Sequence, residues 1–131
     1  WEVSLKIENE ISGAIVNATI EVHRTLGVPG LLESMYEEAL HWEPQNADMN
    51  VERQVSLPVV YKQQTLADPL RIDLLVEKKV IVECKATVKY NQVFEAQTLT
   101  YLRLADLKLG LVINFGEKFV KDGIHRVANG L

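Results

Sequence analysis

The chain has 131 residues, of which 47% are hydrophobic, and this is enough for one domain with a single apolar core. No apolar run approaches the roughly 20 residues that span a bilayer, and no leader-like N-terminal segment is recognisable, so neither a membrane protein nor an exported one is expected. The single cysteine, Cys84, excludes an internal disulfide and favours a reduced, cytoplasmic setting.

The net charge of −4 hides an uneven distribution of charged residues. Residues 1–52 hold ten acids and two bases, a balance of −8, whereas residues 53–131 hold eight acids and twelve bases, a balance of +4. Five of the later bases cluster around one stretch of the chain: Arg71, Lys78, Lys79, Lys85 and Lys89. This asymmetry permits a face that binds nucleic-acid phosphates, although the overall charge is negative.

Two amphipathic helices are predicted in the first third of the chain. In residues 4–26 apolar positions recur at helical spacing, and the glycines and proline within residues 27–30 end the pattern. A second helix is predicted over residues 32–42, followed by a loop over residues 44–50. We expect it to bury one apolar face, formed by Leu32, Met35 or Tyr36, Ala39 and Leu40. We expect its other face to be acidic and solvated, formed by Glu37, Glu38 and Glu43.

The remainder of the chain predicts strands around one more helix. Strand-forming residues concentrate in five segments: residues 51–61, 70–76, 80–85, 108–115 and 124–127. Pro58 predicts a bulge, a break or a sheet edge in the first of these strands. The nearly continuous apolar run of the fourth is typical of a strand covered on both faces. Helical spacing predicts a helix over residues 91–105. The order helix, helix, three strands, helix, two strands predicts one α/β domain over residues 1–131.

Residues 70–86 form the most informative stretch, two strands joined by a tight charged turn. Alternation places three apolar residues on one face of each strand: Ile72, Leu74 and Val76 on the first, and Val80, Val82 and Cys84 on the second. If the two apolar rows share a face, Asp73 lies directly opposite Glu83. Lys85 then follows on the same polar face.

Two carboxylates that face each other across a strand pair normally repel and destabilise it. One interpretation is that both acids simply point into water on a solvated face. The other is that a divalent cation binds between Asp73 and Glu83 and turns the repulsion into attraction, since oxygen ligands suit Mg²⁺ or Mn²⁺. The hairpin alone leaves both interpretations open.

The same residues resemble a known family. An acid on one strand followed by Glu-x-Lys on the next, here Asp73 and Glu83-Cys84-Lys85, resembles the PD-(D/E)xK nuclease superfamily. The predicted order ααβββαββ matches the core of that superfamily, which is a restriction-endonuclease-like α/β fold with a central mixed sheet flanked by helices. One departure is that Pro69 lies four residues before Asp73, so that the Pro-Asp pair is not intact.

Two further motifs extend the resemblance along the chain. Gly30-x-x-Glu33-x-x-Tyr36 resembles the signature of the bacterial GxxExxY proteins, which are assigned to that superfamily. An acid on the helix before the sheet, here Glu33, is a recurrent addition in exonuclease-like branches. A Gln-x-x-x-Tyr pair on the helix after it, here Gln97 and Tyr101, is another, and the four-residue spacing places both on one helix face.

The resemblance implies a nuclease, a hydrolase that cleaves phosphodiester bonds with Mg²⁺ or Mn²⁺, and by analogy DNA is favoured over RNA. The implied metal ligands are Glu33, Asp73, Glu83 and the backbone carbonyl of Cys84. Lys85 would orient the attacking water or stabilise the transition state, and Gln97 and Tyr101 would steady Lys85, the water or a phosphate. Arg71 and Lys89 would contact backbone phosphates without reading their sequence.

Two other functions stay open at this point. A non-catalytic nucleic-acid- or protein-binding module on the same fold would bind without cleavage and would lose little affinity on Lys85→Ala. A purely structural subunit would use the acidic residues 1–52 as an interface and would gain no stability from added metal. A homodimer or a protein partner is also compatible with the sequence, since so small a domain has no obvious extra element for reading DNA.

Overall fold

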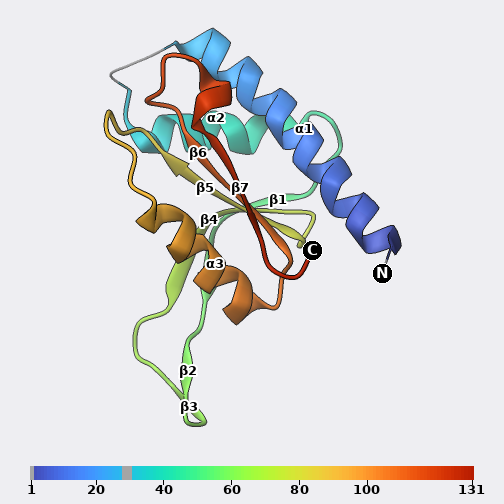
Figure 1. The fold of residues 1–131 in the computed structure, drawn as a ribbon, viewed down its shortest axis with the longest axis vertical. Coiled ribbons are helices and arrows are strands. Elements are labelled where there is room, and N and C mark those ends of the chain that lie inside the picture. The colour runs from blue at the N-terminus through green and yellow to red at the C-terminus, as the bar shows by residue number, and fades with distance from the viewer. Residues whose placement is uncertain (1, 28–30) are drawn as a thin grey trace.

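The computed structural model describes residues 2–27 and 31–131, with side chains described from Ile7 onward in the first helix. Its elements, in chain order, are α1 (Glu2–Leu26), α2 (Glu33–Gln45), β1 (Val51–Leu57), β2 (Val60–Tyr61), β3 (Gln64–Thr65), β4 (Leu70–Val76), β5 (Val80–Lys85), α3 (Val93–Ala105), β6 (Leu109–Asn114), the 3₁₀ helix η1 (Val120–Gly123) and β7 (Ile124–Ala128). Five strands form one sheet in the order β1-β4-β5-β6-β7, with β5 and β6 parallel and the other neighbours antiparallel (Figure 1). The predicted α/β class and mixed central sheet are confirmed.

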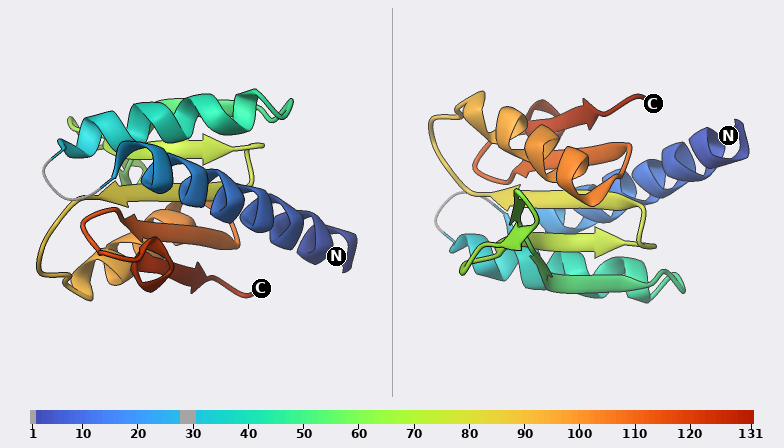
Figure 2. Two further views of the ribbon diagram at one scale, coloured as in Figure 1. Left: turned by 90° about the horizontal axis from the view of Figure 1, so that it is seen from above. Right: turned by 90° about the horizontal axis from the view of Figure 1, so that it is seen from below.

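Helices cover both faces of this sheet. The larger apolar cluster lies under α1 and α2, and the smaller one lies under α3 on the opposite face (Figure 2). All six residues of β6 are buried, which confirms the prediction of a strand covered on both sides. Within residues 2–27 and 31–131, no helix combines the length and apolar character needed to cross a membrane.

α2 is longer than predicted and exposes one residue that was expected in the core. It runs to Gln45, beyond its expected end, and includes Pro44 in its last turn. Tyr36 and Leu40 are each 1% exposed, as predicted. Leu32 is 67% exposed, and the prediction that it is buried is wrong, because it precedes the first helical residue and does not share the inward face of α2.

Tyr36 fixes the start of α2 to two other parts of the chain. Its ring stacks on Phe115, with the ring centroids 4.6 Å apart, and its hydroxyl donates to the carbonyl of Gly27 at 2.8 Å. The tyrosine of the GxxExxY pattern is therefore a core residue that joins α2 to the end of α1 and the end of β6. Gly30 of the same pattern lies outside the described residues.

The β4–β5 hairpin has the predicted register. Val76 pairs with Val80 beside the turn, and the pairing continues antiparallel away from it. The turn residues Glu77 and Lys78 have φ values of 54° and 55°. Positive φ at both central positions is typical of a type I′ turn, whose twist matches that of the strands it joins.

β1 and β4 exchange faces partway along their length. Val51 packs in the larger cluster and Val55 in the smaller one; Leu74 packs in the larger cluster and Ile72 in the smaller one. A regular strand keeps alternate residues on one face, so the predicted common face of Ile72 and Leu74 is wrong. The reversal coincides with Gln54, whose φ of 55° turns β1 over.

The predicted first strand is divided at Pro58, as expected. β1 ends at Leu57, and the chain then forms the short hairpin β2–β3 before it returns as β4. This hairpin, which projects from the body of the domain, is an addition to the predicted order of elements (Figure 1).

Candidate active site

Asp73 and Glu83 meet where the β4–β5 ladder ends. The backbone pairs run from the turn to Leu74 and Val82, and the two acids come next on their strands. There the N–H of Asp73 donates to Oε2 of Glu83 at 2.8 Å, and the N–H of Cys84 donates to Oδ2 of Asp73 at 2.9 Å. The structure thus brings together the two acids that the register placed opposite each other, and a hydrogen bond ties each to the other strand.

Burial raises the proton affinity of both carboxyl groups. Glu83 is only 6% exposed, and burial, reinforced by the charge of Asp73, raises the pKa of Glu83 to about 8. Burial likewise raises the pKa of Asp73 to about 6, and the charges of Glu37 and Glu33 add to that rise. Hydrogen bonds from the backbone and the charge of Lys85 act in the opposite direction on both pKa values. Both pKa values therefore lie above the ordinary carboxyl range, and an additional positive charge beside the pair would favour the ionised form of both groups.

Lys85 lies beside the acid pair and against an aromatic ring. It is close enough to Asp73 and Glu83 for its charge to oppose the rise in both pKa values. Its Nζ lies 4.6 Å from the centroid of the Phe94 ring, which is a cation–π arrangement. The sequence pattern did not identify Phe94, although this residue lies one helical turn before Gln97 on α3.

Gln97 and Tyr101 border the acid pair from α3. Nε2 of Gln97 donates to the Tyr101 hydroxyl at 3.0 Å, which confirms that the two share a helix face. Tyr101 is buried, and burial followed by the charge of Glu83 raises the pKa of Tyr101. The hydroxyl is therefore close enough to the acids to sense their charge, and it stays protonated.

α2 contributes two acids, Glu33 and Glu37. The prediction that Glu37 is solvated is wrong. Glu33 is exposed at the first helical position, whereas Glu37, expected to be solvated, is only 4% exposed. Nε of Arg53 donates to Glu37 at 2.6 Å, and Nε2 of Gln54 donates to its two oxygens at 2.9 and 3.1 Å. These two donors from β1 compensate the buried charge. The four-residue spacing from Glu33 was the available signal, because it places Glu37 on the same helix face.

These acids share a hollow with the sheet. A cavity of about 550 Å³ is lined by Leu32, Glu33, Ser34, Glu37, Arg53, Gln54 and Asp73. It therefore joins the helix acids, the β1 donors and one member of the buried acid pair in one space, which is large enough to admit a phosphate group.

A family model described as the PD-(D/E)XK nuclease superfamily matches residues 9–127. This chain belongs to the PD-(D/E)XK nuclease superfamily. No curated protein and no solved structure gave a match. Asp73 and the Glu83-Cys84-Lys85 sequence lie within the matched range, and Ile72 stands before Asp73 where the pattern in the superfamily's name has a proline.

The carboxylates of this PD-(D/E)XK domain fit a hydrated divalent cation. Among the described residues, no three His, Cys, Asp or Glu side chains converge closely enough to hold a metal ion by themselves. Mg²⁺, however, usually binds one or two protein carboxylates and completes its shell with water and substrate phosphates. Asp73 and Glu83 provide two such carboxylates, and the hydrogen bonds between the strands use only Oδ2 of one and Oε2 of the other.

The two predicted phosphate contacts of this PD-(D/E)XK domain are exposed to solvent. Arg71 and Lys89 are both exposed, the first on β4 and the second between β5 and α3. The segment that carries Lys89 is fixed by the buried Asn114, whose Oδ1 accepts the N–H of Thr87 and whose Nδ2 donates to its carbonyl, both at 3.0 Å. No residue spacing in this part of the chain indicated this anchor. The roles of Arg71 and Lys89 stay predictions.

Proposed function

We propose that this protein is a metal-dependent nuclease that hydrolyses phosphodiester bonds, with DNA as the favoured substrate. The observation that carries the proposal is the Asp73–Glu83 pair, in which Glu83 is buried and Asp73 half-buried, with Lys85 beside it, in a chain of the PD-(D/E)XK nuclease superfamily. A buried Glu83 whose pKa is raised further by Asp73 is costly for a protein that needs only stability, and strongly shifted carboxyl groups of this kind cluster at functional sites.

The proposed cofactor is Mg²⁺ or Mn²⁺. Asp73 and Glu83 would hold it with the backbone carbonyl of Cys84, and Glu33 is proposed as a further ligand from α2. When bound, the cation would supply an activated water and neutralise charge on the phosphate. The thiol of Cys84 takes no part, because it is fully buried in the larger cluster and burial holds its pKa well above the usual value.

The remaining roles belong to side chains that surround the acid pair. Lys85, held against the Phe94 ring, places a positive charge beside the scissile phosphate and stabilises the charge that develops in the transition state. The Gln97–Tyr101 pair orients the attacking water or a phosphate oxygen from α3. Glu37 is a positioning residue, because its hydrogen bonds to Gln54 and its ion pair with Arg53 fix the wall of the cavity that faces Asp73.

We also infer that the chain belongs to the GxxExxY branch of the superfamily. The support is the spacing of Gly30, Glu33 and Tyr36, together with the buried stack of Tyr36 on Phe115. The cytoplasmic setting expected from the single cysteine, and a homodimer or protein partner, stay predictions.

A non-catalytic nucleic-acid-binding module is the second candidate. The observation that favours it is that the α2 acids do not converge with the buried pair into a three-acid group among the described residues. Such a module would keep Arg71 and Lys89 for phosphate contact and would use the acid pair only as a structural feature of the sheet.

A cleavage assay distinguishes the two candidates. Labelled linear, circular and single-stranded DNA, and RNA, are incubated with the protein in Mg²⁺, Mn²⁺ or EDTA, beside Glu83→Ala and Lys85→Ala purified identically. Glu10→Ala and Lys108→Ala are matched controls, because both residues are exposed and lie outside the site. Metal-dependent cleavage lost only in the site variants supports the nuclease. A folded protein that binds nucleic acid but cuts none of these substrates supports the binding module.

A further inference from the structure

The hairpin of residues 58–69 is held outside the hydrophobic core. Every residue from 60 to 69 is exposed, and the two apolar clusters of the described chain include no residue of this segment. It nevertheless presents large apolar side chains to solvent: Val60 is 60% exposed, Tyr61 is 59% exposed and Leu66 is 46% exposed. An exposed two-stranded hairpin contributes little to the stability of the fold. Packing in the core therefore does not explain why these apolar side chains are exposed, and exposed apolar side chains that lie together often mark a binding surface.

The hairpin is nevertheless well defined. Val60 pairs with Thr65 and Tyr61 pairs with Gln64, and a further hydrogen bond from the N–H of Leu66 to the carbonyl of Val59 extends the ladder. The two residues of the turn, at positions 62 and 63, have φ values of 46° and 69°, as a tight turn of two left-handed residues requires. The exposed ring of Tyr61 is therefore displayed on an ordered scaffold.

The hairpin leads into the strand that carries Asp73 of the candidate active site. It continues directly into β4, so that Arg71 and then Asp73 follow it on the same strand. It projects from the sheet past the end of α3 and away from α2 (Figure 1). At roughly 3.3 Å per extended residue, the eight steps from Thr65 to Asp73 span about 26 Å, which is about the length of eight stacked nucleotides.

We propose that this hairpin is a nucleic-acid-binding arm that holds a single strand, or an unpaired strand end, several nucleotides away from the bond to be cleaved. The proposal rests on the proposed nuclease function and extends it to the class of substrate. Tyr61 stacks on a base, Lys62 contacts a phosphate, and Arg71 continues the line of positive charge toward Asp73.

The chemistry of the tip favours nucleic acid as the occupant. Nζ of Lys62 lies 5.4 Å from the centroid of the Tyr61 ring, so one exposed aromatic face and one cation are presented together. Proteins that bind single strands combine such a stacking face with positive charge along the backbone path, and stacking tolerates any base sequence. Arg71 follows at the base of the arm, after the exposed Asp68, and Lys85 lies beside the acids.

The test measures binding separately from cleavage. In the Glu83→Gln background with Mg²⁺ present, fluorescence anisotropy gives the Kd of labelled oligo-dT and oligo-U of 20 nucleotides and of a blunt 20-base-pair duplex. Tyr61→Ala should weaken single-strand binding about 5- to 100-fold, and Tyr61→Phe should restore it to within about twofold. Lys62→Ala should lower the slope of log K against log salt by about 0.7. The dT and U strands distinguish DNA from RNA as the source of the shared chemistry.

Phe119 supplies a matched control. It is 58% exposed, and Nζ of Lys118 lies 5.5 Å from its ring centroid, which reproduces the Tyr61–Lys62 pair. It precedes η1, at the end of the molecule opposite the arm (Figure 1). Phe119→Ala should leave the affinity within about twofold of the background, since stacking is proposed only for Tyr61.

The outcomes separate this proposal from the nuclease. Unchanged strand affinity in Tyr61→Ala overturns the arm even if the wild type cleaves. Equal losses in Tyr61→Ala and Phe119→Ala, or no measurable binding of any oligonucleotide, also overturn it. A change in mass by light scattering in Tyr61→Ala, without a change in strand affinity, assigns the hairpin to self-association instead. Strand binding that depends on Tyr61 in a wild type that cleaves nothing supports the arm and contradicts the nuclease.

Discussion

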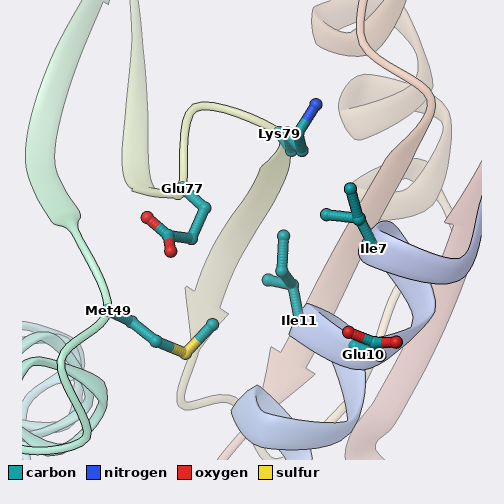
Figure 3. A pocket seen from close by; sticks show the side chains of 6 residues that line it. All are labelled: Ile7, Glu10, Ile11, Met49, Glu77 and Lys79. Atoms are coloured by element: carbon teal, nitrogen blue, oxygen red, sulfur yellow. The ribbon is translucent and has the colours of Figure 1, made fainter. Parts of the chain in front are cut away.

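The two ends of the β4–β5 hairpin carry similar charges in different surroundings. At the turn, Glu77 and Lys79 line a cavity of about 430 Å³ together with residues of α1, and their charged groups point in different directions (Figure 3). At the open end stand Asp73, Glu83 and Lys85. Both ends also use a carboxylate to accept a backbone N–H: Glu77 accepts that of Asn50 at 3.2 Å, much as Glu83 accepts that of Asp73.

Burial distinguishes the two ends. Glu77 is exposed, and water can solvate its charge, whereas Glu83 is enclosed between the sheet and α3 and its pKa rises to about 8. Beside the turn the two strands pair through regular backbone hydrogen bonds. At the open end the carboxylates of Asp73 and Glu83 accept the backbone N–H groups instead. An acid and a lysine on neighbouring strands therefore do not make a site by themselves. At the open end the carboxylates, and not backbone carbonyls, accept the backbone N–H groups, and Glu83 is shielded from solvent. These two features distinguish the candidate site from the turn.

The largest effect should come from neutralising one acid at each end. Glu83→Gln keeps the size of the side chain but removes a proposed metal ligand, and we expect at least a 100-fold loss of cleavage rate, a magnitude typical of removing one group that stabilises the transition state. Glu77→Gln should change the rate less than about twofold. Initial rates at saturating substrate measure both. Comparable losses in the two variants would contradict the distinction between the ends.

The next effect is on stability as a function of pH in the metal-free protein. Because the pKa of Glu83 is about 8 and that of Asp73 about 6 in the fold, the native state binds more protons than the unfolded chain above the ordinary carboxyl range. Stability should therefore fall as pH rises from about 4.5 to 8, by on the order of 4 kcal/mol for Glu83. Urea denaturation in EDTA measures it.

Two variants sharpen this measurement. Glu83→Gln should flatten most of the pH dependence, since the amide does not titrate, whereas Glu77→Gln should leave it as in the wild type. Added Mn²⁺ should raise the melting temperature of the wild type at pH 8 and should raise that of Glu83→Gln less, because ligand binding stabilises only the state that binds. A stability that rises with pH over this range would show that the acid pair is not buried in solution.

Alternation along the strands was enough to predict where the acids meet. The apolar residues nearest the turn, Leu74 and Val76 on β4 and Val80 and Val82 on β5, fixed the register that brings Asp73 to Glu83. The four-residue spacing of Gln97 and Tyr101 correctly predicted their common face. These predictions succeed because they depend on short spacings within one element or across one tight turn, where geometry leaves few alternatives.

The failed predictions depend on contacts between distant segments. Burial of Glu37 follows from donors on β1, 16 and 17 residues away, and nothing in the helix itself announces them. The common face assigned to Ile72 and Leu74 assumed that β4 is a regular strand. β4 instead changes faces together with its neighbour β1, where Gln54 has a positive φ. The contact of Lys85 with Phe94 requires the path of the chain between β5 and α3, which residue spacing does not give.

An effect of intermediate size is expected when the arginine is removed from one of two ion pairs formed by helical glutamates. Arg53 pairs with Glu37, whose side chain is 6% exposed, whereas Arg24 pairs with Glu21, whose side chain is 43% exposed. Arg53→Met should destabilise the fold by about 2 kcal/mol, because it leaves a buried carboxylate short of one donor. Arg24→Met should cause no measurable change in melting temperature, since solvent screens the exposed pair. Equal effects would contradict the burial of Glu37.

The smallest effect should come from the ring beneath Lys85. Phe94 receives Nζ of Lys85 at 4.6 Å on one side and the ring of Tyr90 edge-on, with centroids 5.5 Å apart, on another. Tyr90 is in turn stacked on His125, with centroids 4.0 Å apart, so β7 supports the position of the lysine through two aromatic rings.

Phe94→Leu preserves an apolar side chain but removes the face on which the ammonium group rests. A cation–π contact of this kind contributes about 0.5 to 2 kcal/mol, so we expect kcat to fall about 2- to 30-fold with little change in KM. Phe119→Leu removes the ring of the corresponding exposed pair and should leave both constants unchanged. If Phe94→Leu lowered the melting temperature and raised KM while kcat stayed the same, Phe94 would be a packing residue, and Lys85 would be held by other contacts.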